Sequence, residues 1–589
     1  MIRDSGKWVV LIVTVWIQAF TGTNFDFSSY SSELKSVLDI TQVQLNCLSV
    51  ASDMGKAFGW CSGVSLMYFP LWVVMFMSAF LGLLGYGFQW LVIQRLITLP
   101  YFLVFFLCLV AGCSICWFNT ICYVLCIKNF TTNRSLALSL SISFNGVSAA
   151  FYTLIANAIN SNNDTLYLLL NAIVPLLISA LVLIPILQQQ PQPQQQHSAD
   201  TLNLRDSVVF LCLNILALVT GLYLLFLYSL SSSSLTVARV ILAGAIFLLA
   251  VHFLLPSIVN LKEWSCFTLP TIFTLVDNND DNGLHKELIC KEGNDARSNG
   301  SVHSMMIEKS FCLVSVLEKE KITMLGEEHT TKMLIRRWDF WLYYIAYFCG
   351  GTIGLVYSNN LGQISQSLGY NSETSSLVTL YSTCSFFGRL LAAAPDLFRR
   401  YVLDVLICSF KDNLDILIIV SPLMLYEKCS KTQIARTGWF AAALIPTPIA
   451  FILLAISGTK TALQLSTSLV GLSSGFVFSA AVSITSELFG PNSVGVNHNI
   501  LITNIPLGSC LYGLLAALVY DSNATSSGQS IWLREMSMCM GRKCYMQTFI
   551  WWGCISIVGL VSSFLLFLRT KQAYDSFERN KNSNRIQGN

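Results

Sequence analysis

The feature that most constrains this chain is a series of fourteen hydrophobic stretches, each long enough to cross a lipid bilayer. Inside a bilayer no water can hydrogen-bond the backbone, so an apolar stretch of about 20 residues must form an α-helix. Hydrophobic residues make up 54% of the chain and charged residues only 11%, against about 25% charged residues in soluble proteins. We therefore predict an all-α polytopic membrane protein.

The predicted spans divide the chain into two membrane domains. They occupy residues 8–29, 45–67, 71–93, 101–127, 135–158, 165–187, 207–229, 237–260, 340–362, 374–394, 438–457, 462–484, 499–520 and 547–568. Eight of them lie in residues 1–260 and six in residues 339–570, with the polar segment 261–338 between them and a tail at 571–589. This layout predicts two six-helix bundles, with two additional helices before the polar segment.

The polar segment 261–338 is expected to be a largely disordered cytosolic loop. It mixes charges of both signs, in runs such as Asp277–Gly283 and Glu318–Lys321, and it has no sustained apolar period. A segment that can bury little apolar surface does not offset the entropy cost of ordering its backbone.

Lysine and arginine in the short loops set the orientation, because cytosolic loops carry the excess of these residues. With the N-terminus in the cytosol, the inner side holds the basic tail and Arg3, Lys7, Lys128, Arg134, Arg205, Arg399, Arg400, Lys411, Lys428, Lys431 and Arg436. The outer side then holds Lys35, Arg95, Lys460, Arg534, Arg542 and Lys543. Both termini are therefore predicted to be cytosolic, in either the plasma membrane or an endomembrane.

Two charged residues, Asp53 and Lys56, fall inside the second span. A charge at bilayer depth costs about 2.5–3.5 kcal/mol on insertion scales, so it normally faces a cavity or a partner. A separation of three residues places both on one helical face, where they can pair. One interpretation is a substrate or proton site, with Asp53 as the proton carrier; the other is a structural ion pair that fixes this helix to a neighbour.

The first helix of each six-helix half contains a glycine–threonine turn followed by tyrosine, serine and amide residues. The two segments begin at Gly22 and Gly350. Such a correspondence is typical of an internally duplicated transporter, whose site lies between the halves near the midplane. From this correspondence we select six candidate residues for the solute pathway: Asn24, Asp26, Tyr30, Tyr357, Asn359 and Asn360. Asp26 has a second interpretation, as a residue of the outer headgroup region.

The tenth span ends in a glycine–arginine pair, small residues and then an aspartate. Positive-inside anchoring explains Arg399 and Arg400 that follow, but it does not explain Arg389 or Asp396. An arginine and an aspartate at facing helix ends can form a charge-relay latch. We therefore select Arg389 and Asp396 as candidates for a conformational latch, in a variant of the signature of the major facilitator superfamily.

Several motifs resemble one plant family. The N-terminal half looks like the nodulin-like domain in the motifs Tyr30–Lys35, Ser52–Gly55, Gly85–Gly87, Leu99-Pro100, Lys128–Phe130 and Arg134. The C-terminal half is similar to nuclear-fusion-defective-four-like proteins in Gly388-Arg389, Ser486–Gly490, Asn499, Pro506–Ser509, Tyr520-Asp521, Cys539–Cys544 and Arg569-Thr570. The resemblance implies a transporter of the major facilitator type and adds Glu487 to the latch candidates. It names no solute.

The sequence departs from the family in three places. Thr131 and Ser135 stand where the family has proline and glycine around the Lys-Asn-Phe motif. Ser52 stands where the family usually has lysine, and Lys56 is interpreted as a compensating shift. Residues 401–430 have no counterpart in the family, and the apolar stretch Leu414–Leu425 within them is too short to span a bilayer. We expect this insert to lie outside the helical core.

The leading hypothesis is a secondary transporter that moves a small solute by alternating access. The glycines of Gly82–Gly87 lie within an apolar span and not after a strand, so they do not form a nucleotide-binding loop. The energy would then come from a proton or solute gradient. No cofactor is expected, and the expected partners are the solute, protons and the lipid bilayer.

A different hypothesis is a membrane receptor or scaffold that signals through residues 261–338. A scaffold does not need membrane-buried charges such as Asp53 and Arg389, whereas a carrier does. An enzyme is not expected, because neither paired catalytic carboxylates nor Ser-His-Asp spacing is evident. A net charge of +3 gives no support to nucleic-acid binding. Cys113 and Cys116 lie in an apolar span without a nearby histidine, so no metal site is expected.

Cys539 and Cys544 differ from the other cysteines because they lie in a polar loop on the predicted outer side. An oxidising space on that side would allow them to form a disulfide. This requires their Cα atoms to lie within about 7 Å of each other.

Glycan mapping tests the predicted topology. The sequons at Asn163 and Asn523 fall on the predicted outer side, whereas the sequon at Asn129 falls on the cytosolic side. In a eukaryotic expression host we expect glycosidase-sensitive modification of Asn163 or Asn523 and none of Asn129. A glycan on Asn129 would invert the topology.

Overall fold

The computed structural model is helical throughout the residues that it describes, which are 2–130, 133–160, 166–187, 199–228, 230, 234–266, 322, 324–370, 373–397, 435–525 and 539–587. The N-terminal elements are α1 (Ile2–Thr21), η1 (Thr23–Asp26), α2 (Phe27–Leu38), α3 (Gln42–Ala57), α4 (Gly59–Tyr68), α5 (Leu71–Ile93), α6 (Tyr101–Asn129), α7 (Arg134–Asn145), α8 (Ser148–Asn160), α9 (Leu166–Leu181), α10 (Leu183–Leu187), α11 (Ala199–Leu227) and α12 (Leu235–Cys266). The C-terminal elements are α14 (Thr331–Arg336), α15 (Trp338–Tyr347), η3 (Phe348–Thr352), α16 (Ile353–Ser367), α17 (Thr374–Leu391), α20 (Arg436–Ala443), α21 (Pro446–Ile456), α22 (Lys460–Phe489), α23 (Val494–Ile502), α24 (Asn504–Thr525) and α25 (Lys543–Gln587).

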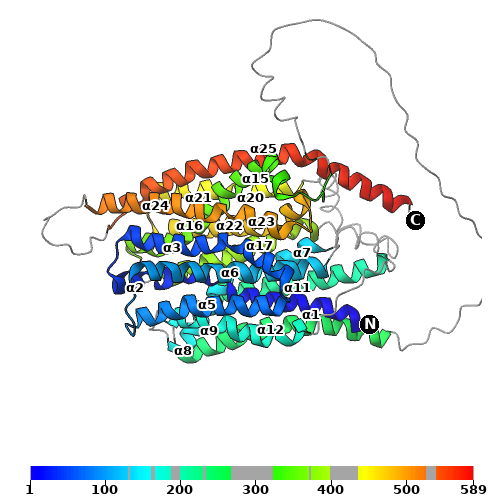
Figure 1. Ribbon diagram of the computed structural model, residues 1–589, viewed down its shortest axis with the longest axis horizontal. Helices are drawn as coiled ribbons and strands as arrows, with labels where there is room; N and C mark the ends of the chain where they lie inside the picture. The colour runs from blue at the N-terminus through cyan, green and yellow to red at the C-terminus, as the bar shows by residue number, and fades with distance from the viewer. Residues whose placement is uncertain are drawn as a thin grey trace, which may run out of the picture.

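The helices form two bundles that lie side by side (Figure 1). In the N-terminal half α5 packs against α6 and α9, and α3 packs against α6. In the C-terminal half α17 packs against α22, and α21 packs against α25. Of the two additional helices, α12 packs against α8 and α1 of the N-terminal half, while α11 packs against α12 and against α17 of the C-terminal half. The fold expected from the sequence is therefore present.

Eleven of the described helices are long and apolar enough to cross a membrane. The other three of the fourteen predicted spans correspond to the shorter helices Gly6–Thr21 and Leu166–Leu181 and to the interrupted pair α3 and α4. The first predicted span, 8–29, was wrong at its end, because α1 stops at Thr21 and helical structure continues through η1 and α2 to Leu38. The insert 401–430, most of the segment 261–338 and Asn163 lie outside the described residues.

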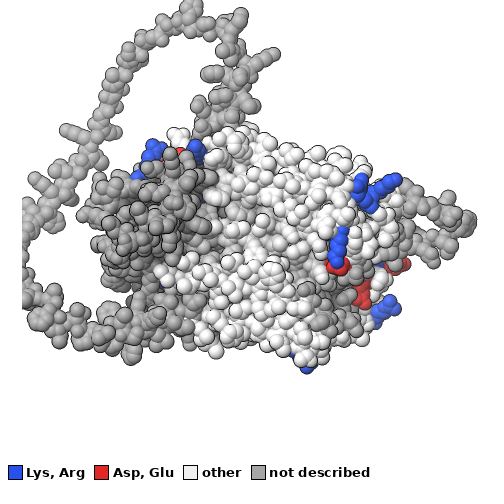
Figure 2. Space-filling view, turned by 180° about the vertical axis from the view of Figure 1, so that it is seen from behind, with Lys and Arg blue, Asp and Glu red and all other residues white. Residues whose placement is uncertain are grey.

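The surface agrees with a membrane-embedded protein. In Figure 2 the Lys, Arg, Asp and Glu side chains gather at the two ends of the molecule, and a broad band without them lies between. Large apolar side chains are exposed on the helices, among them Phe226, Ile456 and Phe102. Both chain termini lie at one end of the bundle (Figure 1), which we call the terminal end. The end of α24 and the start of α25 lie at the opposite end, which we call the disulfide end.

The first helix of each half contains an irregular turn. In the N-terminal half α1 ends before Gly22, where an added Cβ would lie 2.5 Å from the carbonyl oxygen of Asn145, and the 3₁₀ turn η1 follows. In the C-terminal half the π-helical turn η3 contains Gly350 and Gly351. Turns of the π type occur often at functional sites. These are the two glycine–threonine segments that the sequence singled out.

A buried ion pair fixes the last helix to the start of the C-terminal half. Arg569 Nε on α25 lies 2.5 Å from Asp339 Oδ1 on α15, and the two side chains are only 2% and 0% exposed. Breaking a buried pair by removing one partner costs about 3–5 kcal/mol, because the remaining charge stays desolvated. The exposed pair of Lys460 with Glu373 is expected to contribute only about 0.2–1 kcal/mol.

We therefore expect Asp339→Ala to lower the thermal stability of the detergent-purified protein by several degrees, while Glu373→Ala leaves it nearly unchanged. Thermal melts followed by size-exclusion chromatography would measure both. Replacing both partners, as Asp339→Ala with Arg569→Met, should restore part of the loss. Equal effects of Asp339→Ala and Glu373→Ala would contradict this account.

Candidate functional site

A cavity of about 80 Å³ lies between the two halves, lined by residues from both of them. Its charged and polar lining consists of Lys56, Asn119, Tyr123 and Asn145 from the N-terminal half and Tyr347, Arg389 and His498 from the C-terminal half. Apolar side chains complete the wall, among them Ile115, Leu355, Ile502 and Ile505. Solute sites in transporters lie between two such halves, so we take this cavity as the candidate site.

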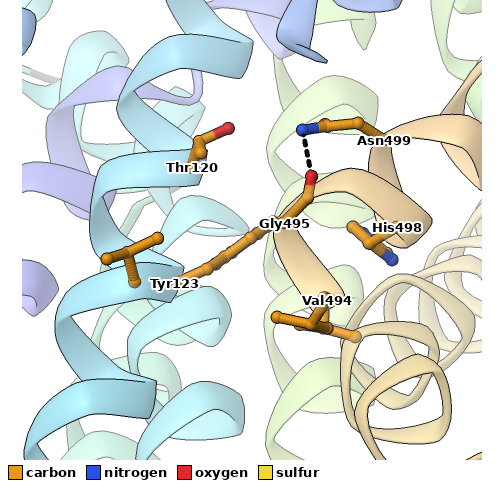
Figure 3. Close-up of a pocket in the computed structure, with 8 residues that line it drawn as sticks. Thr120, Tyr123, Val494, Gly495, His498 and Asn499 are labelled. Atoms are coloured by element: carbon orange, nitrogen blue, oxygen red, sulfur yellow. Dashed lines mark hydrogen bonds between the residues drawn. The ribbon is translucent and has the colours of Figure 1, made fainter. Parts of the chain in front are cut away.

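A smaller space of about 10 Å³ lies next to it between α6 and α23. Figure 3 shows Thr120 and Tyr123 on α6 facing Val494, Gly495, His498 and Asn499 on α23. Asn499 is held by a hydrogen bond from its Nδ2 atom to the carbonyl oxygen of Gly495, at 2.6 Å. Tyr123 and His498 line both spaces, so the two adjoin at these side chains.

Arg389 reaches the cavity because α17 lies very close to α22. An added Cβ on Gly388 would lie 2.0 Å from the carbonyl oxygen of Leu472, and one on Gly475 would lie 2.1 Å from that of Ser385. Small residues at such contacts let helices approach closely. Arg389 Nη1 donates to the carbonyl oxygen of Ile142 at 3.0 Å and to Asn145 Oδ1 at 2.9 Å, so it contacts the opposite half.

Asp53 and Lys56 form an ion pair on α3, with Lys56 Nζ 2.5 Å from Asp53 Oδ1. Their position is set by close packing of α3 on α6. An added Cβ on Gly55 would lie 2.1 Å from the carbonyl oxygen of Leu109, and one on Gly112 would lie 1.7 Å from that of Ser52. Both charged side chains are buried, and Lys56 lines the cavity.

The other carboxylate oxygen of Asp53 is bound by the opposite half. Ser509 Oγ on α24 donates to Asp53 Oδ2, and Asn359 Nδ2 on α16 lies 3.4 Å from the same oxygen. Two further contacts continue this line toward the disulfide end: Asn46 Nδ2 donates to the Gly513 carbonyl oxygen at 2.9 Å, and Ser28 Oγ donates to the Ser358 carbonyl oxygen at 2.7 Å. We call these contacts the outer seam.

At the terminal end Arg436 joins two acidic residues. Arg436 Nη2 lies 2.6 Å from Asp396 Oδ2, and Arg436 Nε lies 2.9 Å from Glu487 Oε1. Ser135 on α7, in the opposite half, donates to Asp396 Oδ2 at 2.5 Å, while Tyr574 donates to Glu487 at 2.7 Å. We call this group the Arg436 cluster. The structure thus brings together two of the three latch candidates, and it places the third, Arg389, at the cavity.

The pairing of Arg436 with Asp396 and Glu487 was not predicted from the sequence, where Arg436 counted only as a positive-inside residue. A signal was available, because Arg436 is the first residue of α20. This helix begins at the same membrane surface as Asp396 and Glu487. A basic residue in that position can pair with both acidic side chains.

The remaining pathway candidates lie within one half or at the interface. Asp26 in η1 is fully buried, and Tyr30 on α2 packs against Phe27 at a ring distance of 5.6 Å. Tyr357 shares a hydrogen bond with Thr467 at 2.7 Å inside the C-terminal half. Asn360 Oδ1 accepts from Asn46 across the outer seam at 3.3 Å. Asn24 lies in η1. Asp26, Tyr30, Tyr357 and Asn360 are not among the described side chains that line the cavity.

The loop before α23 is held by Glu328 outside the membrane-spanning helices. Its carboxylate accepts from the backbone N–H groups of Asn492 at 2.8 Å and Ser493 at 3.1 Å, and from the Ser493 hydroxyl at 2.6 Å. Partial burial alone would raise the pKa of Glu328, but these hydrogen bonds outweigh it and hold that pKa below its ordinary value. Because the folded pKa is lowered, the stabilisation is present at neutral pH and is lost as the pH falls through that pKa.

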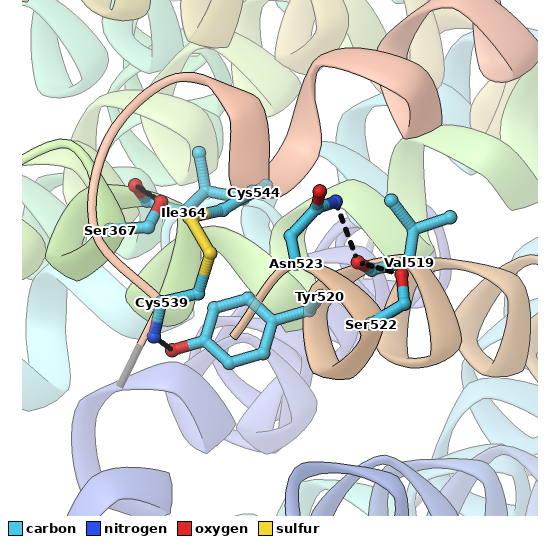
Figure 4. Close-up of a disulfide and its surroundings, with 8 residues drawn as sticks. All are labelled: Ile364, Ser367, Val519, Tyr520, Ser522, Asn523, Cys539 and Cys544. Carbon is cyan, nitrogen blue, oxygen red and sulfur yellow. Dashed lines mark hydrogen bonds between the residues drawn. A yellow bond between two sulfur atoms is a disulfide. The ribbon is translucent and has the colours of Figure 1, made fainter. Parts of the chain in front are cut away.

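A disulfide between Cys539 and Cys544 closes a short loop at the disulfide end (Figure 4). The two Cα atoms are 5.9 Å apart, within the distance expected from the sequence. The Cys539 N–H donates to the Tyr520 hydroxyl at 3.1 Å, and the Gly541 N–H donates to the Ser367 carbonyl oxygen at 2.7 Å. The loop therefore ties the start of α25 to α24 and α16. Nearby, Asn523 Nδ2 donates to the Val519 carbonyl oxygen at 2.8 Å.

Among the residues that the structure describes, no group of three or more His, Cys, Asp or Glu side chains is placed to hold a metal ion. The polar and basic side chains described in the cavity lining can offer hydrogen bonds and positive charges, and apolar side chains complete the wall.

Comparison with known families identifies the chain. The nodulin-like family model matches residues 7–260, and the model described as NFD4, C-terminal domain, matches residues 323–409 and 403–576. Protein NUCLEAR FUSION DEFECTIVE 4 of Arabidopsis thaliana is 52% identical over 577 residues, which cover 98% of this chain and 90% of that protein. The chain belongs to the nodulin-like family. This nodulin-like protein is an integral, multi-pass membrane protein.

Solved structures of transporters have similar helix arrangements. One, from work on substrate recognition in proton dependent oligopeptide transporters, is 9% identical with a TM-score of 0.48 and covers 97% of this chain and 100% of its own. The xylose transporter XylE of E. coli is 9% identical with a TM-score of 0.46, covering 94% of this chain and 97% of its own. FucP, a major facilitator superfamily transporter, is 12% identical with a TM-score of 0.39, covering 96% and 97%.

The close packing of α3 on α6 can be tested with two glycines of the same span. Gly55→Ala places a methyl group 2.1 Å from the Leu109 carbonyl oxygen, whereas an added Cβ on Gly63 meets nothing within 4 Å. We expect Gly55→Ala to reduce the yield of monodisperse protein severalfold and Gly63→Ala to leave it unchanged. Fluorescence-detected size-exclusion chromatography would measure both. Tolerance of Gly55→Ala at wild-type yield and melting temperature would show that the contact does not position Asp53.

Proposed function

We propose that this nodulin-like protein is a secondary active transporter that moves a small solute by alternating access through the cavity between its halves. The cavity takes lining residues from both halves, which is what a site with alternating exposure requires. Contacts between the halves lie on both sides of it: the outer seam toward the disulfide end and the Arg436 cluster at the terminal end. The predicted orientation puts the terminal end in the cytosol.

The observation that carries this proposal is the double role of Asp53. One carboxylate oxygen binds Lys56, which lines the cavity, and the other is bound by Ser509 and Asn359 of the opposite half. A single ionisable group therefore connects the solute site to the contact that closes the outer side.

Protonation of Asp53 would couple a proton gradient to solute movement. The groups that face Asp53 are Lys56 on α3, Asn359 on α16 and Ser509 on α24, and only Lys56 among these carries a charge. A neutral carboxyl group loses its charge-assisted bonds to all three, which are about twice as strong as neutral ones. Loss of the proton restores the ion pair with Lys56 and the charge-assisted bonds from Ser509 and Asn359.

The energy source is assigned to a gradient because the glycine-rich segment Gly82–Gly87 lies inside the helix α5. A nucleotide-binding loop needs such glycines between a strand and a helix. A receptor or scaffold without transport remains the competing function, and a transport assay separates the two.

Asp53→Asn tests the proton role. The amide keeps the shape of the side chain but cannot take up a proton, so we expect solute-driven proton movement to fall at least tenfold while solute exchange persists. The full chain would be reconstituted in liposomes that contain a pH-sensitive dye and exposed to organic anions, amino acids, sugars and metal complexes.

Glu373→Gln is the matched control, because Glu373 lies at the exposed pair with Lys460. It should behave like the wild type in the same liposomes. Proton movement in Asp53→Asn equal to that in the control would remove Asp53 from the coupling mechanism. Absence of any solute movement in the wild type across the panel would favour the receptor or scaffold.

A further inference from the structure

We propose that Asp26 and Asn171 form a binding site for one monovalent cation, a proton or Na⁺, inside the N-terminal half. Neither residue is among the described side chains that line the cavity, and the site does not depend on the proposed transport function. The inference follows from the unpaired, buried carboxylate of Asp26, from the lack of a counter-charge on the helices around it and from a second unpaired side chain beside it.

The carboxylate of Asp26 is buried without a partner. Asp26 lies in η1, its side chain is 0% exposed, and within the described residues neither of its carboxylate oxygens has a hydrogen-bond partner. The other two acidic residues described as buried, Asp53 and Asp339, each pair with a basic side chain. Burial of an ionised carboxylate is very costly unless the charge is paired, taken up by a proton or bound to a metal ion. Asp26 therefore needs a positive charge.

The neighbouring helices do not supply that charge. Neither lysine, arginine nor histidine occurs in α5, α8 or α9. The other elements in contact with η1 are α2, α6 and α17. On α2 the charge of Lys35 faces Asp521, and on α6 Lys128 lies about 30 Å along the helix from Cys108. Arg389, the one charged side chain of α17, donates to α7, and the oxygens of Asp26 accept no hydrogen bond from it.

A second unpaired side chain lies beside the carboxylate. Asn171 on α9 faces Asp26 and is also 0% exposed. In the described part of the chain, neither its amide oxygen nor its amide nitrogen has a partner with hydrogen-bond geometry. Buried polar groups are normally satisfied, so two such side chains together point to a ligand. A proton on Asp26 would turn the carboxyl group into a donor toward the Asn171 oxygen, and Na⁺ would bind oxygens of both side chains.

The surroundings limit the ligand to a single positive charge. Tyr30, Tyr86 and Tyr152 are the ionisable side chains that face Asp26, and Cys108 adjoins the first two. Phenols and thiols are neutral at pH 7. Thr23 and Tyr86 share a hydrogen bond at 2.7 Å, and the Tyr152 hydroxyl donates to a backbone carbonyl of α1 at 2.8 Å. One carboxylate balances one monovalent cation, whereas a divalent ion would leave a buried positive charge. The oxygen-rich surroundings suit a hard cation.

The start of α2 connects this site to the contact between the halves. Ser28, two residues after Asp26, donates to the Ser358 carbonyl oxygen in the outer seam. One turn further on, Ser31 Oγ accepts from Gln363 Nε2 at 3.3 Å. A cation at Asp26 would stabilise η1 and with it the position of both serines. If the protein works by alternating access as proposed, an occupied site favours the closed outer seam.

Asp26→Asn tests the site in the purified full chain, because the amide keeps the shape of the side chain but needs no cation. Thermal melts would be recorded in NaCl and in choline chloride at equal ionic strength, and infrared spectra would record the C=O stretch of protonated carboxyl groups at neutral pH. A wild-type melting temperature several degrees higher in NaCl would assign Na⁺. A protonated-carboxyl band without this sodium effect would assign the proton. We expect Asp26→Asn to abolish the signal that the wild type gives.

Asp339→Asn is the matched control, because Asp339 is equally buried but paired with Arg569. It should melt at a lower temperature than the wild type and keep the sodium effect or the carboxyl band. Asp206→Asn, at the partly buried pair with Lys7, replaces it if its yield is too low. Asp26→Asn itself should melt close to the wild type in choline chloride.

If Asp26→Asn does not fold, Asn171→Leu carries the test. It keeps the carboxylate but removes the amide oxygen beside it. We expect the NaCl concentration for half of the sodium effect to rise about tenfold, or the carboxyl band to move. An unchanged signal in Asn171→Leu would then overturn the site.

Three results would contradict the inference: a wild type with neither signal, a signal that persists unchanged in Asp26→Asn, or an equal loss of signal in Asp26→Asn and in the control. These measurements do not involve solute movement. A failure to detect transport in liposomes would therefore leave the cation site standing, and a failure to detect the cation would leave transport standing.

Discussion

The carboxylate of Asp53 is the group on which the relation between the two halves depends. It is almost completely buried, and the cost of removing a carboxylate from water is several kcal/mol. That cost is offset by Lys56 on its own helix and by Ser509 and Asn359 on the opposite half. Separation of the halves on this side would remove two of these three partners, so these contacts favour the closed arrangement that the structure shows.

The charged groups can occupy these places only because the helices beneath them approach unusually closely. Ordinary helix pairs lie about 8–10 Å apart, held there by their side chains. Gly55 and Gly112 remove that spacing between α3 and α6, and Gly388 and Gly475 remove it between α17 and α22. Asp53 and Arg389 stand directly beside these contacts. Each half thus builds a closely packed helix pair that carries one buried charged residue into contact with the opposite half.

The sequence predicted the all-helical, multi-pass membrane fold, because apolar length alone determines whether a segment can lie in a bilayer, whereas eleven of the fourteen predicted spans correspond to described helices long and apolar enough to cross it. It did not predict the break between α3 and α4 or the extent of the first helix, since apolar composition continues across both. Asp53 and Lys56 could be paired from their spacing on one helix. The bonds from Ser509, and the role of Arg436 between Asp396 and Glu487, join residues far apart in the chain, and hydrophobic pattern carries no information on such contacts.

The two sides of the cavity are closed by different physical means. In the Arg436 cluster the side chains of Asp396 and Glu487 are 18% and 29% exposed, so water screens their attraction to Arg436. Such a cluster can exchange partners at small cost whenever the halves move. Asp53 is shielded from water, at 2% exposure. In the proposed cycle the outer seam would respond to a proton on Asp53, and the Arg436 cluster would follow the movement that results. The proposed order of events thus runs from the buried carboxylate to the partly exposed ones.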